Sequence, residues 1–271
     1  MQSVRSGGEA HAETGFVGDK ADTYAQKYAD ETPAGFALRV RRQRVLQLFD
    51  KPGGKVLDVG CGPGEMVDDL LNLGCEFWGV DPSARMIEIC RRKYSEIHKV
   101  NFQLGPAEQL DFADGQFDAV VCMGVIDGLQ SAGAALREMG RVLKPGGTII
   151  ITFSNHRSPY AWWKGFVYYR ALAVMRRIFH PRLKHDPIFV RRRLFTPQTA
   201  TELLASFGMR AERTVGYFYN IILSPLDEIW PAATLWVNRK LEKARDGKVD
   251  SLAAGFIVKA VNTASAAEAR A

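Results

Sequence analysis

Short apolar runs, each ending in a polar or glycine-containing turn, recur through the first 155 residues of the chain. Their length of four to six residues is typical of buried strands. Between and before them lie segments whose apolar positions are spaced three or four residues apart, which predicts helices. The predicted strands cover 55–59, 77–81, 101–104, 117–122 and 148–153, and the predicted helices cover 21–29, 35–49, 65–73 and 134–143. This alternation is typical of an α/β fold built on a parallel sheet.

The last third of the chain predicts one more helix, two more strands and a long connection. Thr196 is a good helix cap and Pro197 suits the first helical position, so a helix is expected to begin there and to end at Gly208. The last two strands are predicted at 210–217 and 254–261, joined by a connection that is mostly helical around 229–241.

Three alternate glycines, Gly60, Gly62 and Gly64, follow the first strand. Without Cβ atoms they let a ligand lie directly on the backbone, and the helix that follows points its N-terminal amides toward that ligand. Dinucleotide-binding turns are similar in composition, but their spacing is G-x-G-x-x-G, and here Glu65 stands where the third glycine would be. The spacing therefore argues against a nicotinamide cofactor.

The second strand ends in an acid, Asp81, which lies 17 residues after Gly64. An acid at this place can accept hydrogen bonds from both hydroxyls of a ribose. Pro82 and Ser83 then open a helix, with the proline in its first turn, and Met86 would place a thioether beside a bound base.

Four stretches of the chain together carry a family resemblance: VLDVGCGPG, GVDPS, FDAVVCMGVIDGL and EMGRVLKPGGTIIIT. In this order and spacing they resemble the class I S-adenosylmethionine (SAM)-dependent methyltransferases of the type 11 kind, over 24–154 and again over 195–213. The resemblance implies a Rossmann-like, seven-stranded, mostly parallel sheet with helices on both faces, an antiparallel last strand, an N-terminal helical cap and an insertion after strand five. It also implies SAM as cofactor and methyl transfer as the reaction.

By that resemblance the glycine turn passes under the methionine part of SAM, and Asp58 organises the turn. Asp81 holds the ribose hydroxyls, Met86 packs on the adenine, and the end of strand four lines the cofactor floor. The complete set of expected cofactor contacts is Tyr28, Arg39, Asp58, Gly60, Cys61, Gly62, Gly64, Asp81, Pro82, Met86, Ala107, Glu108, Met123 and Gly124.

Two parts of this set cannot be taken directly from the family pattern. The family commonly has an acid directly after Gly105, where this chain has Pro106, so the contact with the adenine amine is moved to Glu108. In the family the N-terminal cap often offers polar groups to the SAM carboxylate, which points to Tyr28 and Arg39. The alternative is that the arginines of this helix form a solvated face.

Methyl transfer from a sulfonium is an in-line displacement, so positioning supplies most of the catalysis. A general base is needed only when the nucleophile is a hydroxyl. Asp127 and His156 follow strands four and five, where ligands bind in such sheets, and each is a candidate base. The alternatives are that Asp127 caps a helix and that His156 is a loop residue bonded to backbone or water. The spacing of metal-binding residues gives no reason to expect a metal.

Length and composition predict one domain rather than two, because 271 residues with 46% hydrophobic content can bury one large core. We expect that domain over 16–263, with the helical cap at 16–50, the insertion at 155–195, and disordered tails at 1–15 and 264–271. Four cysteines without a C-x-x-C pair predict neither disulfides nor a zinc site, and favour a reducing, cytoplasmic location. The sequence shows neither an apolar signal segment in residues 1–15 nor a run of 18 apolar residues. We therefore expect neither secretion nor a membrane-spanning helix.

The net charge of +6 is concentrated in one segment. Residues 155–195 hold ten of the 36 basic residues and one of the 30 acidic ones, a surplus of +9, whereas the rest of the chain carries −3. Within this segment, 160–179 predicts a helix with an apolar face, basic residues opposite and aromatic residues nearby. Such a helix suits an anionic membrane interface, and the alternative is a lid packed on the sheet. Its placement resembles the insertion of the ubiquinone-biosynthesis O-methyltransferases.

These observations leave several functions open. The first is O-methylation of a small hydrophobic or lipid-like acceptor at a membrane surface. The second is C- or O-methylation of an anionic isoprenoid or sugar-lipid, with the arginines at 191–193 on its phosphate, or of a soluble secondary metabolite. The third is a non-catalytic SAM-binding protein. Nucleic acid methylation is not expected, because the N/D-P-P-Y/W/F motif is absent after strand four. The sequence gives no prediction of the oligomeric state.

Overall fold

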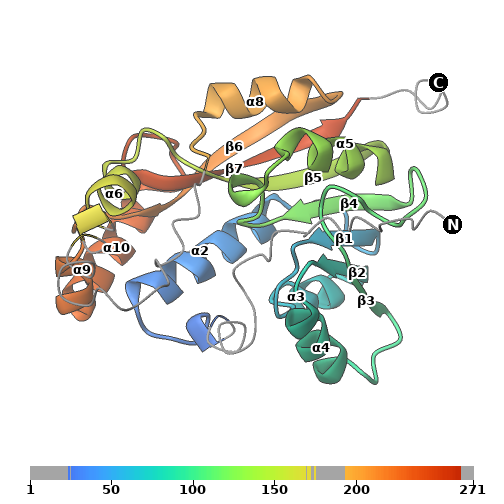
Figure 1. Cartoon of the computed structure of the whole chain (residues 1–271), viewed down its shortest axis with the longest axis horizontal. Coiled ribbons are helices and arrows are strands. Elements are labelled where there is room, and N and C mark those ends of the chain that lie inside the picture. The colour runs from blue at the N-terminus through green and yellow to red at the C-terminus, as the bar shows by residue number, and fades with distance from the viewer. Residues whose placement is uncertain (1–23, 25, 169, 172–173, 175–192, 264–271) are drawn as a thin grey trace, which may run out of the picture.

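The computed structural model describes residues 24, 26–168, 170–171, 174 and 193–263, which are arranged around one seven-stranded sheet (Figure 1). The strand order is β3-β2-β1-β4-β5-β7-β6. Neighbours from β3 to β5 are parallel, whereas β7 is antiparallel to both β5 and β6. The predicted sheet with its antiparallel last strand is therefore confirmed. The strands are β1 Lys55–Val59, β2 Glu76–Asp81, β3 Val100–Leu104, β4 Phe117–Cys122, β5 Leu143–Ser154, β6 Met209–Tyr219 and β7 Ala253–Asn262.

Helices cover both faces of this sheet (Figure 1). The central strands are apolar at successive positions because both of their faces are buried. Leu57 and Val59 belong to the core under α5 and α8, whereas Val56 belongs to the core under α2 and α3. The helices of the two layers are α2 Pro33–Leu48, α3 Val67–Asn72 and α4 Ala84–Lys93 on one face, and α5 Ala132–Val142 and α8 Pro197–Ala205 on the other.

Hydroxyl caps fix where two of these helices begin. Thr196 and Thr199 form a capping box at the start of α8, as the sequence predicts. At α4 the cap is Ser83, whose Oγ accepts a hydrogen bond from the Met86 amide at 3.4 Å. Pro82 therefore lies before the cap and not in the first helical turn, which corrects the sequence-based expectation.

The insertion after β5 differs from the single α-helix predicted over 160–179. A short helix, α6 Pro159–Trp162, continues directly into a π-helical turn, η2 Trp163–Tyr168. A π-helix has more residues per turn, so the spacing that would align apolar residues on one α-helical face no longer does so. Val167 is half-buried, whereas Val174 is exposed. The remainder of the predicted helix, from 175, lies outside the described residues, as do both predicted tails.

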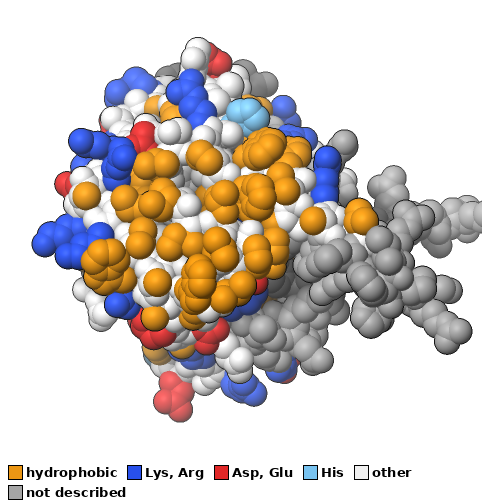
Figure 2. Space-filling model, turned by 90° about the vertical axis from the view of Figure 1, so that its left-hand side faces the viewer, with side chains coloured by type: hydrophobic (Ala, Val, Ile, Leu, Met, Phe, Trp, Pro, Cys, Tyr) orange, Lys and Arg blue, Asp and Glu red, His pale blue; other side chains and the backbone are white. Residues whose placement is uncertain are grey.

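The connection between β6 and β7 forms two helices, α9 Leu226–Ile229 and α10 Pro231–Arg245, instead of the single helical stretch predicted around 229–241. Their end of the sheet also holds α6, and it exposes a broad area of apolar side chains (Figures 1 and 2). Within the part of the chain that the structure describes, no helix is long and apolar enough to cross a bilayer.

Candidate functional site

The turn after β1 is shaped by glycines that no other residue could replace without strain. Gly60 has a φ of 75°, and a Cβ there would overlap Val125 Cγ2 from the loop after β4. Gly62 has a φ of 52°, but a Cβ there would meet only Tyr24 Cε1, at 3.9 Å. The turn is thus tightly packed at Gly60 and open at Gly62. This is the arrangement expected where a ligand lies on the backbone.

The carboxylate of Asp81, at the end of β2, is held in place by two backbone amides. Gly62 donates to Oδ2 at 3.0 Å and Ser83 donates to Oδ1 at 2.9 Å. Burial raises the pKa of Asp81, while these two amides act in the opposite direction. Each carboxylate oxygen has a second lone pair, so Asp81 can still accept hydrogen bonds from a diol. The structure therefore joins the glycine turn to the acid that the sequence assigned to a ribose.

Asp58, the last but one residue of β1, is a buried carboxylate that accepts no hydrogen bond from the described residues. Its pKa is raised to about 7, mainly by burial and also by the charge of nearby Asp81, while the charge of Arg41 acts in the opposite direction. An unsatisfied carboxylate beside an open glycine turn is a strong acceptor for a cationic or hydrogen-bond-donating group.

Arg41 on α2 is a site residue that the sequence analysis did not find. Its Nη2 donates to the Tyr28 hydroxyl at 3.3 Å, and its Nη1 lies 2.5 Å from where a Cβ on Gly124 would stand. Its buried Nε has no partner among the described residues. The expected residue, Arg39, instead donates to the backbone carbonyls of Tyr28 and Asp30 at 2.8 and 2.7 Å. Arg39 thus fastens the N-terminal cap, whereas Arg41 lies against Gly124 in the loop after β4, and its charge acts on Asp58.

The close spacing of the arginines on α2 explains why the sequence did not show which of them lies at the site. Four arginines lie within 39–44 of α2, and each could face solvent, the cap or the ligand. Only the packing of α2 on the sheet places Arg41 over the ends of β1 and β4. The signal available in the sequence was the presence of tyrosines in the cap, one of which, Tyr28, becomes the partner of Arg41.

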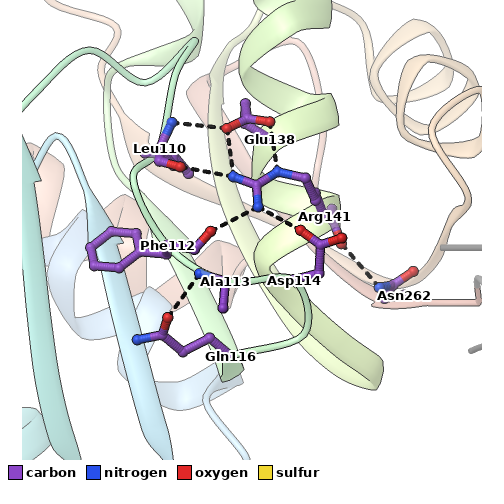
Figure 3. Close-up of polar contacts among 9 residues, drawn as sticks. Leu110, Phe112, Ala113, Asp114, Gln116, Glu138, Arg141 and Asn262 are labelled. Atoms are coloured by element: carbon purple, nitrogen blue, oxygen red, sulfur yellow. Dashed lines mark hydrogen bonds and ion pairs between the residues drawn. The ribbon is translucent and has the colours of Figure 1, made fainter. Parts of the chain in front are cut away.

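The loop after β3 is fastened to α5 by a hydrogen-bonded clamp around Arg141 (Figure 3). Arg141 donates to the carbonyls of Leu110 and Phe112, each at 2.8 Å. It also pairs with Asp114 at 2.6 Å and with Glu138 at 2.8 Å, and Glu138 accepts from the Leu110 amide at 2.9 Å. The clamp fixes a loop that has almost no secondary structure of its own.

That loop carries two of the expected contacts at the adenine edge. Ala107 is buried and Glu108 is half-buried, directly before the clamped residues. Met86 of α4 is buried at 3% exposure. Pro106, which stands where the resemblance leads us to look for an acid, is exposed. The structure leaves Glu108 as the acid of this loop nearest in sequence to Ala107, and its role stays a prediction.

The ends of β4 and β5 meet through Asp127. This residue lies in the short 3-10 helix η1, Ile126–Gly128, and its Oδ2 accepts from the Ser154 amide at 3.0 Å and from the Ser154 hydroxyl at 2.6 Å. Asp127 thus fastens the end of β5 instead of capping a helix. Gly124 donates its amide to Thr152 Oγ1 at 2.7 Å, and Met123 before it is half-buried.

His156 lies two residues beyond Ser154, and its side chain is exposed. Its backbone amide donates to the Phe195 carbonyl at 2.8 Å, which anchors the start of the insertion. Both candidate bases therefore stand at the carboxyl edge of the sheet, as predicted. Asp127 is buried and His156 is exposed, so they would face an acceptor differently.

The four cysteines are all buried and unpaired, including Cys61 in the glycine turn. Across the described residues no group of three or more His, Cys, Asp or Glu side chains could hold a metal ion.

Part of the chain matches known methyltransferase sequences. Residues 57–151 match a family model described as "Methyltransferase domain". A ubiquinone biosynthesis O-methyltransferase of Xanthomonas oryzae is 32% identical over 125 residues, which are 45% of this chain and 52% of that protein. A ubiquinone/menaquinone biosynthesis C-methyltransferase of Geotalea daltonii is 33% identical over 124 residues, 43% of this chain and 53% of that protein. The chain thus matches about half the length of these curated relatives.

Among solved structures, the magnesium protoporphyrin IX methyltransferase of Synechocystis PCC 6803 with bound SAH is similar in fold. The TM-score is 0.57 at 17% identity, and the match covers 91% of this chain and 96% of that one. At this identity the likeness concerns the fold alone.

The residues at the site fit SAM in three respects. The glycine turn is open above Gly62, the Asp81 carboxylate can accept a diol, and the buried Asp58 carboxylate has no partner among the described residues. Arg41 can face a carboxylate from the opposite side. All of these groups stand at the carboxyl edge of β1, β2 and β4, at the point where the strand order reverses.

Proposed function

We propose that the protein, whose residues 57–151 match the methyltransferase-domain model, is a SAM-dependent methyltransferase that O-methylates a small hydrophobic or lipid-like acceptor at a membrane surface. The observation that carries the cofactor assignment is the pair of hydrogen bonds that lock Asp81 to the glycine turn and to the start of α4. A diol-binding acid rigidly coupled to a ligand-binding turn suits a nucleoside cofactor with a second polar part.

When bound, SAM supplies a methyl group activated by its sulfonium. The chain's own residues then have three tasks. Asp81 and the glycine turn hold the ribose and the amino acid part, while Arg41 and Asp58 provide opposite charges for the carboxylate and the cationic groups. By holding the cofactor rigidly, these residues would let the methyl group meet the acceptor in line, and such positioning would supply most of the rate.

The acceptor oxygen requires a base if it enters as a neutral hydroxyl. Asp127 and His156 are the proposed bases because both lie just beyond strand ends at the ligand edge. Asp127 also holds Ser154, so its carboxylate is already oriented by a hydrogen bond at 2.6 Å.

Acceptor chemistry is proposed from the similarity to quinone-pathway relatives and from the surface near the site. The basic insertion at 155–195 is proposed to lie against anionic lipid and to admit the acceptor from that side. Similarity to a C-methyltransferase keeps C-methylation as the second candidate. The arginines at 191–193, which would grip a phosphate in the anionic-acceptor alternative, lie partly outside the described residues.

Calorimetric titration with SAM tests the cofactor assignment. Wild type should bind, and Asp81→Ala should lose on the order of 2 to 4 kcal/mol, because charge-assisted hydrogen bonds contribute about 1.5 to 3 kcal/mol each and do not add fully. Glu202→Ala, on the exposed side of α8, is the control and should bind like wild type. Absence of SAM binding by wild type, or unchanged binding by Asp81→Ala, would refute the assignment.

A further inference from the structure

The end of the molecule that holds α6, α9 and α10 exposes an unusual concentration of large apolar side chains (Figure 2). Eight of the eleven exposed large hydrophobic residues in the described part of the chain belong to this end. We name them the docking face: Trp162, Phe166, Val174, Ile221, Leu226, Ile229, Trp230 and Trp236. Single exposed apolar residues are ordinary, but a cluster of this kind marks an interaction surface.

The larger part of the docking face comes from the connection between β6 and β7. Ile229, Trp230 and Trp236 are 59%, 60% and 63% exposed, more than the tryptophan of α6. Pro231, Ala232 and Ala233 between them are exposed as well. Trp236 lies three and four residues after the two alanines, so these side chains share one side of α10. The apolar area therefore continues from α9 along the first two turns of α10.

Direct contacts join this connection to the insertion after β5. The Tyr160 hydroxyl donates to Asp227 Oδ2 at 2.9 Å, and Trp163 Nε1 donates to the Ser224 carbonyl at 2.6 Å. Lys164 lies 3.6 Å from Glu228. These polar contacts hold the insertion after β5 and the β6–β7 connection together, although the two segments are far apart in sequence. Exposed apolar side chains from both segments form the docking face.

Basic side chains border the docking face. Lys240 lies over the Trp236 ring at 5.9 Å, and Arg170 lies over the Phe166 ring at 5.5 Å. Among the described residues of 155–174, Arg157, Lys164 and Arg170 are basic and none is acidic, and residues 220–245 add four basic and three acidic residues. Tryptophan beside lysine or arginine on an amphipathic surface is the combination that settles at the headgroup level of a bilayer.

We propose that α9 and α10 insert apolar anchors into the interfacial layer of an anionic membrane, and that basic side chains beside the docking face, among them Arg170 and Lys240, supply the attracting charge. The inference rests on the proposed function and extends it, because the membrane contact then involves the β6–β7 connection as well as the basic insertion. Charge decides between a bilayer and a second copy of the chain: two docking faces would bring the same positive rims together, whereas an anionic surface complements them.

Co-sedimentation with vesicles, without SAM or acceptor, tests the proposal. The vesicles contain phosphatidylcholine alone or phosphatidylcholine with phosphatidylglycerol. Wild type should pellet with the anionic vesicles, and added salt should weaken binding without removing it, because charge attraction is screened within roughly 8 Å at physiological salt and apolar contacts are not. Trp230→Ser/Trp236→Ser should lower the partition coefficient at least on the order of 100-fold, since two large apolar side chains no longer leave water.

The matched control is Leu73→Ser/Ile97→Ser, two exposed apolar residues after α3 and α4. It removes comparable exposed positions far from the docking face and should pellet like wild type. Calorimetry with SAM on each variant shows that the cofactor site is intact, so a double tryptophan variant that binds both SAM and vesicles like wild type contradicts this inference and leaves the proposed function standing.

Two results would overturn the proposal. One is equal pelleting of wild type and the double tryptophan variant with anionic vesicles, or no pelleting of wild type at all. The other is a dimer of wild type in sedimentation velocity that becomes monomeric in the tryptophan variant without any vesicle binding, which would make the docking face a contact between copies.

Discussion

The sequence predicts the place of a site residue when a local backbone motif determines it. It does not predict the place of a residue that is positioned by the packing of a helix on the sheet. Asp81 follows a glycine turn at a fixed distance, so its place at the edge of the sheet could be inferred from the sequence, and the amides of Gly62 and Ser83 hold it there. Arg41 could not be distinguished from Arg39 on α2, because both occupy one short arginine-rich stretch. The difference arises from which of them faces Gly124 and which faces the cap carbonyls.

Asp58 gives a pH-dependent contribution to the stability of the free protein. Its pKa in the folded state is raised from 3.8 to about 7, mainly by burial. The folded protein therefore binds more protons than the unfolded chain between those two values, and the free energy of unfolding falls as pH rises through that window. The free-energy cost of ionising the buried Asp58 carboxyl is absent below pH 3.8 and fully present above about pH 7.

Asp58→Asn should remove this slope, because an amide has the same shape and does not ionise. Denaturant unfolding of the free protein at pH 5 and pH 8 measures it. The variant should gain stability over wild type by a few kcal/mol at pH 8, and by roughly a third of that gain at pH 5. Parallel curves for the two proteins would show that Asp58 keeps its charge when folded.

The two candidate bases are separated by their effects on turnover. If the acceptor is a hydroxyl, His156→Ala or Asp127→Asn should lower the rate by about 10² to 10⁴ while SAM affinity stays near wild type. Ser154→Ala is the control for Asp127, because it removes the hydrogen-bond partner at 2.6 Å and leaves the carboxylate. Full turnover by both base variants would mean that positioning alone suffices, and equal losses by Ser154→Ala and Asp127→Asn would mean that Asp127 only fastens β5.

At the scale of elements, an irregular loop reaches the site because a helix holds it. The loop after β3 carries Ala107 and Glu108, and its clamp comes from Glu138 and Arg141, one turn apart on α5. The sequence predicts α5 by its apolar spacing, but nothing in that spacing indicates that Arg141 will bind backbone carbonyls 29 and 31 residues earlier. Long-range hydrogen bonds of this kind leave no periodic signal.

Arg141→Met should destabilise the protein by about 2 kcal/mol, because hydrogen bonds to a charged group are worth roughly 1.5 to 3 kcal/mol and this guanidinium is partly solvated. Arg91→Met, which removes one exposed hydrogen bond to the Phe102 carbonyl, should cost much less. Thermal or denaturant unfolding compares them. Equal losses in the two variants would contradict the clamp.

The same clamp predicts the acid limb of the stability profile. The hydrogen bond from Arg141 is the main reason that the pKa of Glu138 lies below its usual value of 4.5. This contribution is present above pH 4.5 and is lost as pH falls through the folded-state pKa. The stability gap between wild type and Arg141→Met should therefore narrow below pH 4.5, and a constant gap would show that Glu138 and Arg141 are not coupled.

At the scale of the whole molecule, the cofactor site and the docking face lie at different places on the same sheet. The cofactor site is assembled at the carboxyl edge, where the strand order reverses between β1 and β4. The docking face lies at the β6 and β7 end, where two insertions meet (Figures 1 and 2). An acceptor dissolved in lipid would approach from this end.

The sequence by itself determined the alternation of strands and helices, the glycine turn, the acid after β2 and the surplus of charge in one segment. Those features are local: strand length, turn chemistry and composition are each read within a few residues. Only the tertiary structure decided that Arg41 lies against Gly124, that Asp127 fastens β5, that α5 clamps the loop after β3, and that α9 and α10 join α6 in one apolar surface. Each of these depends on contacts between residues far apart in the chain, which the packing of helices on the sheet creates and local pattern does not encode.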